Sequence, residues 1–323
     1  MTLPNTMTAA ILTGFGGPEN LVLAERPVPE PRDHEILVKL AAATVNSADI
    51  RIRTRTYPKG FGLLASLVFG FRKPRVPILG AELSGTVVAV GRSATRFVAG
   101  DEIIAMPGFG SHQQYRAIAE TKPIVKKPEN LSFEQAAALS FGGTTALYFL
   151  RRAMLQAGEK ILVIGGSGTV GSALVQLARH MGAEVTAATS APNMELAQNL
   201  GAKRVIDYHY TDYTTEHAAY DVIADTAGVT SLDACLDALK PGGRFLGIAA
   251  SLPGMLRQSK GGKRNVTGTT PERTEDLQYL TALAAQGIYT PLIDSVFPLS
   301  EIAKAHTRAA SGLKRGSVVV TMP

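Results

Sequence analysis

Apolar and polar positions alternate in short runs along the first 125 residues, and glycine and proline interrupt these runs. Short alternating runs bounded by turn residues are typical of β-strands. The strands predicted in this way are residues 8–12, 21–25, 35–45, 85–90, 102–106 and 112–118. We therefore expect a β-rich, barrel-like unit in this part of the chain.

The pattern changes at Ser132, where the sequence Ser-Phe-Glu-Gln fits a helix N-cap followed three residues later by a capping glutamine. Buried-type apolar runs then alternate with helical periodicity. The predicted strands are 160–164, 184–189, 204–207, 220–225 and 244–249, and the predicted helices are 132–139, 171–181, 193–200, 231–239 and 272–286. This alternation predicts an α/β doubly wound parallel sheet.

Extended sequence returns at 291–298 and 317–321, in a style similar to the first third of the chain. The sequence thus predicts two domains: residues 1–125 plus 290–323, and residues 126–289. The extended segment 264–269 is a candidate edge strand that could pair across a homodimer.

The clearest motif follows the strand predicted at 160–164, where Gly166, Gly168 and Gly171 form a GxGxxG turn between a strand and a helix. In such turns the first glycine permits a tight bend, the second lets the backbone approach a pyrophosphate, and the third lets the helix pack closely on its strand. The helix N-terminus then attracts the phosphates. The predicted phosphate-binding residues are Gly166, Ser167, Gly168, Thr169, Val170 and Gly171.

The end of the next strand distinguishes between two dinucleotides. An acidic residue at that position binds the ribose 2′-hydroxyl of NAD. Here the strand ends in Thr189 and Ser190, followed by Asn193, and the acid Glu184 lies at the opposite end of the strand. Small neutral hydrogen-bonding groups leave room for a 2′-phosphate, so the sequence favours NADPH.

Composition narrows the class of protein. The chain has 323 residues, of which 45% are hydrophobic and 19% charged, which is typical of a folded globular protein. Its single cysteine, Cys235, excludes an internal disulfide and a thiolate zinc cage, and we expect it to be a buried, unreactive thiol. The start of the chain shows no secretory signal, so a cytoplasmic location is expected.

Lys and Arg exceed Asp and Glu by six, and residues 51–75 contain seven basic residues and no acidic one. This run lacks the recognisable fold signature of a nucleic-acid binder, so it is either a solvated surface or an anion-attracting rim. The apolar run 60–71 is too short to span a membrane and is expected to cover an apolar pocket. Neither nucleic acid nor membrane is expected as a partner.

Five further segments are informative beside the glycine turn: residues 45–50, 76–85, 97–102, 143–146 and 200–208. With them the chain resembles the medium-chain dehydrogenase/reductase superfamily, in particular its zinc-independent, zeta-crystallin-like quinone oxidoreductase branch. The resemblance implies a Rossmann domain that binds NADPH and a GroES-like catalytic domain. Zinc-dependent relatives carry cysteine where Asn46 stands and histidine where Ala81 stands. Because an alanine side chain offers zinc no donor, no catalytic metal is expected.

The resemblance also implies a set of site residues. Asn46 and Tyr57 would lie near the nicotinamide and act on the acceptor, with Tyr57 donating a hydrogen bond to its oxygen. Further cofactor contacts are implied for Thr145, Tyr208, Thr226 and Ile248. Local alternatives remain for four of them: a turn for Asn46, packing for Tyr57, a helix cap for Thr145 and a surface position for Tyr208.

The predicted activity is hydride transfer from NADPH to a quinone or an α,β-unsaturated carbonyl compound, since these acceptors need no zinc to polarise them. Two alternatives remain at this point: an alcohol or carbonyl dehydrogenase of the same superfamily, and a non-catalytic NADPH-binding protein.

Overall fold

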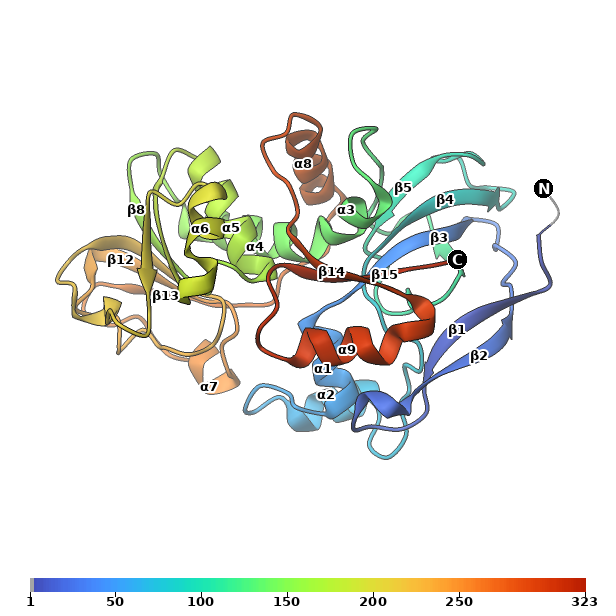
Figure 1. The fold of residues 1–323 in the computed structure, drawn as a ribbon, viewed down its shortest axis with the longest axis horizontal. Coiled ribbons are helices and arrows are strands. Elements are labelled where there is room, and N and C mark those ends of the chain that lie inside the picture. Colours follow the sequence, from blue (N-terminus) through green and yellow to red (C-terminus); the bar gives the residue numbers. More distant parts are fainter. Residues whose placement is uncertain (1–2) are drawn as a thin grey trace. The chain divides into compact units, whose positions relative to one another are not determined.

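A computed structural model describes residues 3–323 and divides the chain into two compact units (Figure 1). Unit 1 contains residues 3–57, 62–141 and 272–323, and unit 2 contains Pro58–Phe61 and Gly142–Pro271. The fold class is the predicted one: the chain contains a parallel-sheet α/β unit and a β-rich unit.

Unit 2 is built on a six-stranded, wholly parallel sheet with the strand order β10-β9-β8-β11-β12-β13. This is the 3-2-1-4-5-6 order of a doubly wound nucleotide-binding sheet. The strands are β8 (Lys160–Ile164), β9 (Glu184–Thr189), β10 (Arg204–Asp207), β11 (Tyr220–Asp225), β12 (Leu239–Gly247) and β13 (Arg264–Val266). The helices and 3-10 turns are α4 (Ser140–Ala153, which starts in unit 1), α5 (Thr169–His180), η2 (Ala191–Asn193), α6 (Met194–Asn199), η3 (Tyr213–Thr215) and α7 (Leu252–Met255).

The prediction of a helix at residues 231–239 is wrong. The segment forms consecutive turns, and β12 begins at Leu239 and draws the end of the segment into the sheet. Leu232, Cys235 and Leu239 nevertheless point into the core of the sheet and are fully buried. The spacing of apolar residues therefore identified the buried side of this segment correctly, although the backbone is not helical.

Unit 1 contains a seven-stranded sheet, in which the order is β14-β15-β3-β4-β5-β7 and β6 also pairs with β3, and a separate β1–β2 hairpin. Its strands are β1 (Thr6–Leu12), β2 (Leu21–Pro27), β3 (Glu35–Val45), β4 (Leu83–Val90), β5 (Glu102–Ala105), β6 (Tyr115–Ala119), β7 (Ile124–Lys126), β14 (Ile293–Pro298) and β15 (Ser317–Thr321). Its helices and 3-10 turns are η1 (Pro18–Asn20), α1 (Ser47–Thr54), α2 (Gly62–Phe69), α3 (Phe133–Ala138), α8 (Thr274–Ala285), η4 (Leu299–Glu301) and α9 (Ile302–Ala310). The C-terminal strand β15 lies between β14 and β3.

Two segments lie in a different unit from the one that the sequence suggested. The sequence pattern places residues 126–141 and 272–289 in the dinucleotide-binding domain, whereas in the structure they belong to unit 1. The reason is tertiary packing, because α3 contacts β3 and β4, and α8 contacts β7. The start of α3 is as predicted: Ser132 Oγ accepts the N–H of Gln135 at 3.2 Å, and Gln135 Oε1 accepts the N–H of Ser132 at 3.0 Å.

Within residues 3–323, every helix is too short or too polar to cross a lipid bilayer.

Candidate functional site

The glycine turn of unit 2 follows β8, at the point where the strand order of the sheet reverses. Ligands bind at this position in open α/β sheets. The left-handed backbone conformation that makes the bend lies at Gly165, with φ at +80°, and not at Gly166 as the sequence suggested. Gly166 instead lies against β9, because a methyl group added to it would be 2.9 Å from Cβ of Ala187.

The other two glycines of the motif differ in how much room surrounds them. A methyl group added at Gly171 would lie 2.0 Å from the carbonyl oxygen of Gly165, so no larger residue fits there without a backbone shift. A methyl group at Gly168 would meet only that same oxygen, at 3.4 Å, which is ordinary van der Waals contact. Packing of the protein therefore requires glycine at position 171 but not at position 168.

Helix α5 begins directly after Gly168, with Thr169 and Val170 as its first two residues. The N–H groups in the first turn of a helix have no acceptor within that helix. Gly168 has no side chain to cap them, and the first turn contains no acidic residue. This helix start is therefore suited to a phosphate group, which accepts N–H hydrogen bonds and is attracted by the helix dipole.

A group of neutral side chains surrounds the end of β9. The hydroxyls of Ser167 and Thr189 are 3.0 Å apart, and Asn193 Nδ2 donates to Ser167 Oγ at 3.2 Å and to Ser190 Oγ at 3.1 Å. Asn193 Oδ1 is buried and accepts no hydrogen bond from any of residues 3–323. The nearby acid of the sequence, Glu184, forms an ion pair with Lys203 at 3.0 Å instead. The cluster thus offers hydrogen bonds without a carboxylate that would repel a 2′-phosphate.

Three more predicted residues follow the carboxyl ends of neighbouring strands: Tyr208 after β10, Thr226 after β11 and Ile248 after β12. Because the sheet is parallel, these ends lie at the same edge as the glycine turn. The Thr226 hydroxyl donates to the Ile164 carbonyl at 2.8 Å, which ties it to the end of β8. Tyr208 is 47% exposed, and its N–H donates to the Thr189 carbonyl at 3.3 Å.

Thr145 is buried inside α4, so it does not cap that helix as the local alternative required. The same helix approaches the glycine turn, because a methyl group added to Gly142 would be 2.6 Å from the carbonyl oxygen of Thr169. Sequence reasoning missed Asp225, the last residue of β11. Its carboxylate accepts the N–H groups of Ala227, Gly228 and Thr230 at 2.8–2.9 Å and thereby holds the loop that contains Thr226.

In unit 1, Asn46 is the N-cap of α1 and is 5% exposed. Its Oδ1 accepts the N–H groups of Ala48 and Asp49 at 2.9 and 3.3 Å, and Asp49 Oδ2 accepts the N–H of Asn46 at 2.9 Å. The turn role that the sequence left open is therefore real. It uses only the oxygen of the amide, and Nδ2 is buried with no partner in the described part of the chain.

Tyr57 follows the other end of α1 and stacks on Phe69, with ring centroids 6.3 Å apart. Its hydroxyl is buried and makes no hydrogen bond to any residue that the structure describes. It borders a cavity of about 330 Å³ that Leu63, Ser66 and Phe71 also line. Burial raises the pKa of the Tyr57 hydroxyl, which keeps it protonated and able to donate, although Arg55 opposes the shift.

Asn46 and Tyr57 stand at opposite ends of α1, which is eight residues long. At 1.5 Å per residue, the helix separates them by roughly 12 Å. The packing alternative for Tyr57 is partly correct, since its ring belongs to the core that also contains Phe69. Its hydroxyl, however, forms no hydrogen bond with any of residues 3–323.

Two buried carboxyl groups near Asn46 were also missed by sequence reasoning. Asp49 Oδ1 accepts the N–H of Gly80 at 2.8 Å. Glu82 accepts the hydroxyl of Thr44 and, at 2.6 Å, the N–H of Phe141. Burial raises the pKa of Glu82 to about 7. Both carboxyl groups join segments that are far apart in sequence, which explains why no local pattern revealed them.

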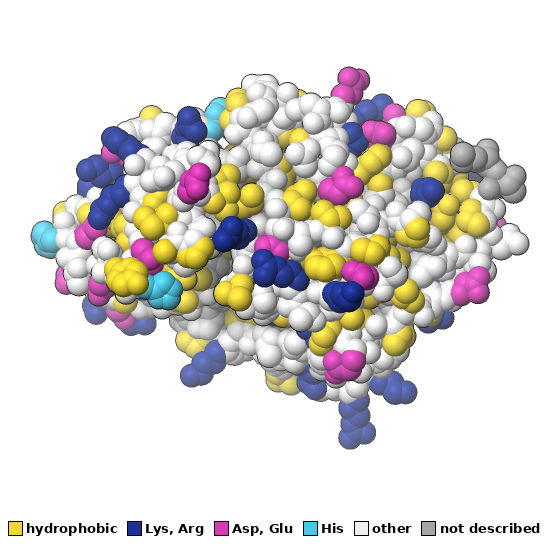
Figure 2. Space-filling model, viewed as in Figure 1, with side chains coloured by type: hydrophobic (Ala, Val, Ile, Leu, Met, Phe, Trp, Pro, Cys, Tyr) yellow, Lys and Arg dark blue, Asp and Glu magenta, His cyan; other side chains and the backbone are white. Residues whose placement is uncertain are grey.

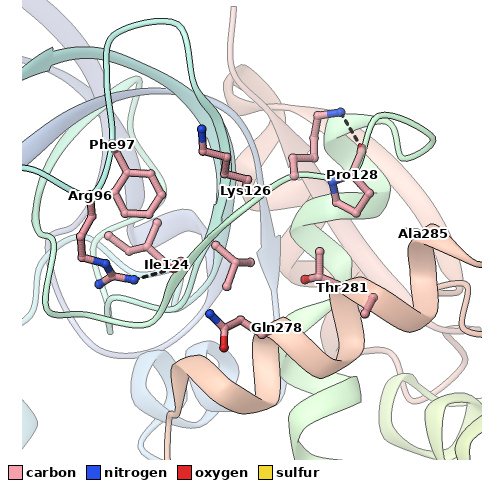
Figure 3. Close-up of a pocket in the computed structure, with 11 residues that line it drawn as sticks. Arg96, Phe97, Ile124, Lys126, Pro128, Gln278, Thr281 and Ala285 are labelled. Atoms are coloured by element: carbon pink, nitrogen blue, oxygen red, sulfur yellow. Dashed lines mark hydrogen bonds between the residues drawn. The ribbon is translucent and has the colours of Figure 1, made fainter.

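The larger cavity of unit 1, about 610 Å³, lies between β7 and α8 (Figure 3). Arg96, Phe97 and Ile124 line one side of it, and Gln278 and Thr281 of α8 line the other. It contains none of the predicted catalytic or cofactor-binding residues. Size alone therefore does not identify the candidate active site, and the smaller cavity beside Tyr57 has the more suitable chemistry.

Comparison with known proteins agrees with this geometry. A family profile described as alcohol dehydrogenase GroES-like domain matches residues 32–150, one described as zinc-binding dehydrogenase matches residues 200–320, and one described as NAD dependent epimerase/dehydratase family matches residues 161–238. A human protein named quinone oxidoreductase is 32% identical over 95% of this chain and 94% of its own length. The chain belongs to the medium-chain dehydrogenase/reductase superfamily.

Two more members of the superfamily are informative. An Arabidopsis thaliana protein named NADPH-dependent alkenal/one oxidoreductase, chloroplastic, is 32% identical over 99% of this chain and 80% of its own length. The solved structure of the quinone oxidoreductase from Coxiella burnetii is 28% identical, with a TM-score of 0.84, over 98% of this chain and all of that one. The family and branch suggested by the sequence are therefore confirmed.

The description of one matching profile names zinc, which binds only particular donor groups. Zinc is held by nitrogen, thiolate or carboxylate donors, usually four in tetrahedral geometry. Asn46 uses its amide oxygen to cap α1, and Ala81 has no donor. Among residues 3–323, no three His, Cys, Asp or Glu side chains are grouped so that they could hold a metal ion. The side chains present at Asn46 and Ala81 do not fit zinc.

Proposed function

We propose that this chain is an NADPH-dependent oxidoreductase that reduces quinones or α,β-unsaturated carbonyl compounds without zinc. The names of its relatives, quinone oxidoreductase and NADPH-dependent alkenal/one oxidoreductase, support this reaction class. The glycine turn at the switch point of unit 2 supports a dinucleotide cofactor.

The residues that would hold NADPH are those at the carboxyl edge of the unit 2 sheet. The start of α5 would bind the pyrophosphate through N–H groups of its first turn, after Gly168. Ser190 and Asn193 would hydrogen-bond the 2′-phosphate, and the unpaired Asn193 Oδ1 supports a ligand beside them. Thr145, Tyr208, Thr226 and Ile248 would contact the remainder of the cofactor. When bound, NADPH supplies the hydride.

The observation that carries the proposed catalytic role is the buried Tyr57 hydroxyl, which has no partner within residues 3–323 and borders a cavity. A buried donor without an acceptor costs about 1–3 kcal/mol, so its retention is explained if an acceptor oxygen completes the hydrogen bond. As negative charge develops on that oxygen, the donor stabilises it. The unpaired Nδ2 of Asn46 is a second donor of this kind, which would hold the acceptor.

Replacing Tyr57 with phenylalanine tests this role. Because one donor aimed at developing charge is removed, we expect kcat with a quinone or an enone to fall by up to about 100-fold. The ring still packs on Phe69 and an unpaired buried hydroxyl is removed, so the melting temperature should stay the same or rise. Tyr210→Phe, at a side chain that is 88% exposed, is the matched control. Full activity of Tyr57→Phe would mean that Tyr57 only packs.

A panel of acceptors distinguishes this proposal from its two alternatives. Turnover on quinones and enones supports it, turnover on simple aldehydes or alcohols indicates an alcohol or carbonyl dehydrogenase, and tight NADPH binding without turnover indicates a non-catalytic protein. Asn46 and Ala81 disfavour an alcohol or carbonyl dehydrogenase, because these side chains do not hold a zinc ion that would polarise the substrate oxygen.

We also propose that the protein is a cytoplasmic homodimer. Strand β13 supports the pairing, because it is at the edge of the unit 2 sheet and can accept a second copy alongside. Light scattering on the purified protein tests this, and a monomer mass would reject it.

A further inference from the structure

Helix α2 presents an apolar surface that the rest of the structure does not cover. Leu63, Leu64, Leu67 and Val68 are 71%, 61%, 50% and 54% exposed. At 100° per residue they occupy one continuous arc of the helix. Large apolar side chains that are grouped and exposed mark a surface that binds something apolar.

The opposite side of α2 is fixed to unit 1. Ser66 is buried, and its hydroxyl receives a hydrogen bond from Arg55 Nη2 at 2.9 Å. Phe69 packs between Tyr57 and Phe109, with ring centroids at 6.3 and 5.6 Å. The helix is therefore held by one face, and the outward direction of its leucines follows from this anchoring.

Cations lie next to the C-terminal end of the apolar arc. The chain turns back at Gly70, whose φ is +108°, and exposed Arg72, Lys73 and Arg75 follow directly. The side chain of Arg75 bonds to the carbonyl of Leu67, which keeps this basic loop beside the helix. No acidic residue occurs between Asp49 and Glu82. Figure 2 shows Lys and Arg side chains projecting from the edge of unit 1 at which Figure 1 places α1 and α2.

We propose that α2 and the basic loop after it, residues 62–75, dock unit 1 onto the surface of an anionic phospholipid bilayer. The exposed leucines of α2 would lie at the boundary between headgroups and acyl chains, and the Lys and Arg side chains of the following loop would lie at the anionic headgroups. The charge of this surface disfavours a second copy of the chain as the occupant, because pairing the surface with itself would bring two positively charged segments together.

This proposal departs from the sequence-based expectation of no membrane partner, which considered only a spanning segment. Its test can be separated from the proposed reaction, since none of Leu64, Val68, Arg72 and Lys73 lines the cavity beside Tyr57.

The test is flotation of the full-length protein with vesicles made of equal parts of phosphatidylserine and phosphatidylcholine, and with vesicles of phosphatidylcholine alone. We expect binding to the mixed vesicles that weakens as salt is added, and binding at least about tenfold weaker to phosphatidylcholine. Arg72→Gln/Lys73→Gln should reduce binding about 30-fold, at roughly fivefold for each charge. Leu64→Ser/Val68→Ser should also lose binding, because the buried apolar area is removed.

The control variants remove the same charge, or one exposed apolar side chain, elsewhere on unit 1. Arg26→Gln/Arg92→Gln and Leu313→Ser, all at exposed positions, should bind as the unchanged protein does. Thermal melting checks that each variant is folded. The proposal is overturned if the unchanged protein does not float with the mixed vesicles, if the controls lose as much binding as the α2 variants, or if the α2 variants only dissociate an oligomer.

Discussion

Replacing Gly171 with alanine should lower the stability of the protein, whereas replacing Gly168 with alanine should mainly weaken NADPH binding. The added methyl group at Gly171 would lie 2.0 Å from the Gly165 oxygen, 2.8 Å from the Gly165 carbonyl carbon and 3.0 Å from Cα of Gly166. All three atoms are backbone, so none can rotate away. At Gly168 the nearest atom is 3.4 Å away, and φ is −77° with ψ at 174°, a conformation that alanine adopts freely.

These distances set the expected magnitudes. Overpacking against backbone costs about 1–3 kcal/mol and occasionally more, and the 2.0 Å approach places Gly171→Ala at the upper end. A loss of about 3 kcal/mol corresponds to a fall in melting temperature of roughly 6–12 °C. Gly168→Ala replaces an acceptable N-cap residue with a poor one, so its cost is smaller, at most about 1 kcal/mol. If the pyrophosphate contacts this backbone, however, the methyl group should weaken NADPH binding about tenfold or more.

Two measurements separate the effects: a thermal melt without cofactor, and a titration with NADPH followed by its fluorescence. Gly171→Ala should lower the melting temperature. Gly168→Ala should change the melting temperature much less and should bind NADPH more weakly. If Gly168→Ala binds NADPH as tightly as the unchanged protein, the phosphate site is not at this turn. If Gly171→Ala is as stable as the unchanged protein, the packing argument is refuted.

Three more predictions concern the cofactor, a buried acid and metal dependence. Ser190→Asp should weaken NADPH binding by about 1.5–3 kcal/mol through repulsion of the 2′-phosphate, and an unchanged ratio of NADPH to NADH use would contradict the proposed specificity. The pKa of Glu82 is raised from 4.5 to about 7, so its ionisation makes the native state less stable as pH rises from about 4.5 to 7. The unfolding free energy of Glu82→Gln should therefore rise relative to that of the unchanged protein across this pH range, by on the order of 3 kcal/mol. Urea denaturation at several pH values measures this difference. A difference that does not depend on pH would show that Glu82 does not titrate in this range. Dialysis against a chelator should leave quinone turnover intact, and metal analysis of active protein should find no stoichiometric zinc.

The sheet of unit 2 was the most predictable part of the fold. The predicted bounds of β8, β9, β10 and β11 are those observed, because parallel strands are covered on both faces and so appear as continuous apolar runs. The phosphate-binding turn was equally visible, since its glycines are close in sequence. The bend itself was misplaced by one residue, because a glycine pattern does not reveal which member has positive φ.

Contacts between distant segments were beyond the reach of the sequence. The pairing of Glu82 with the N–H of Phe141 joins residues 59 positions apart, and Asp49 with Gly80 joins residues 31 apart. No local periodicity encodes such contacts. The same holds for α2, whose composition showed that it is apolar but not which side faces outward, since that depends on the anchoring of Ser66 and Phe69.

The position of β15 has a consequence for how the protein is made. This strand is the last element of the chain, yet it pairs with β3, an element encoded near the start. On the ribosome, residues 42–45 of β3 therefore lack their partner until residues 317–321 have emerged, while residues 142–271 can already be folding. Release of the nascent chain before β15 has been made would leave this part of β3 open to aggregation.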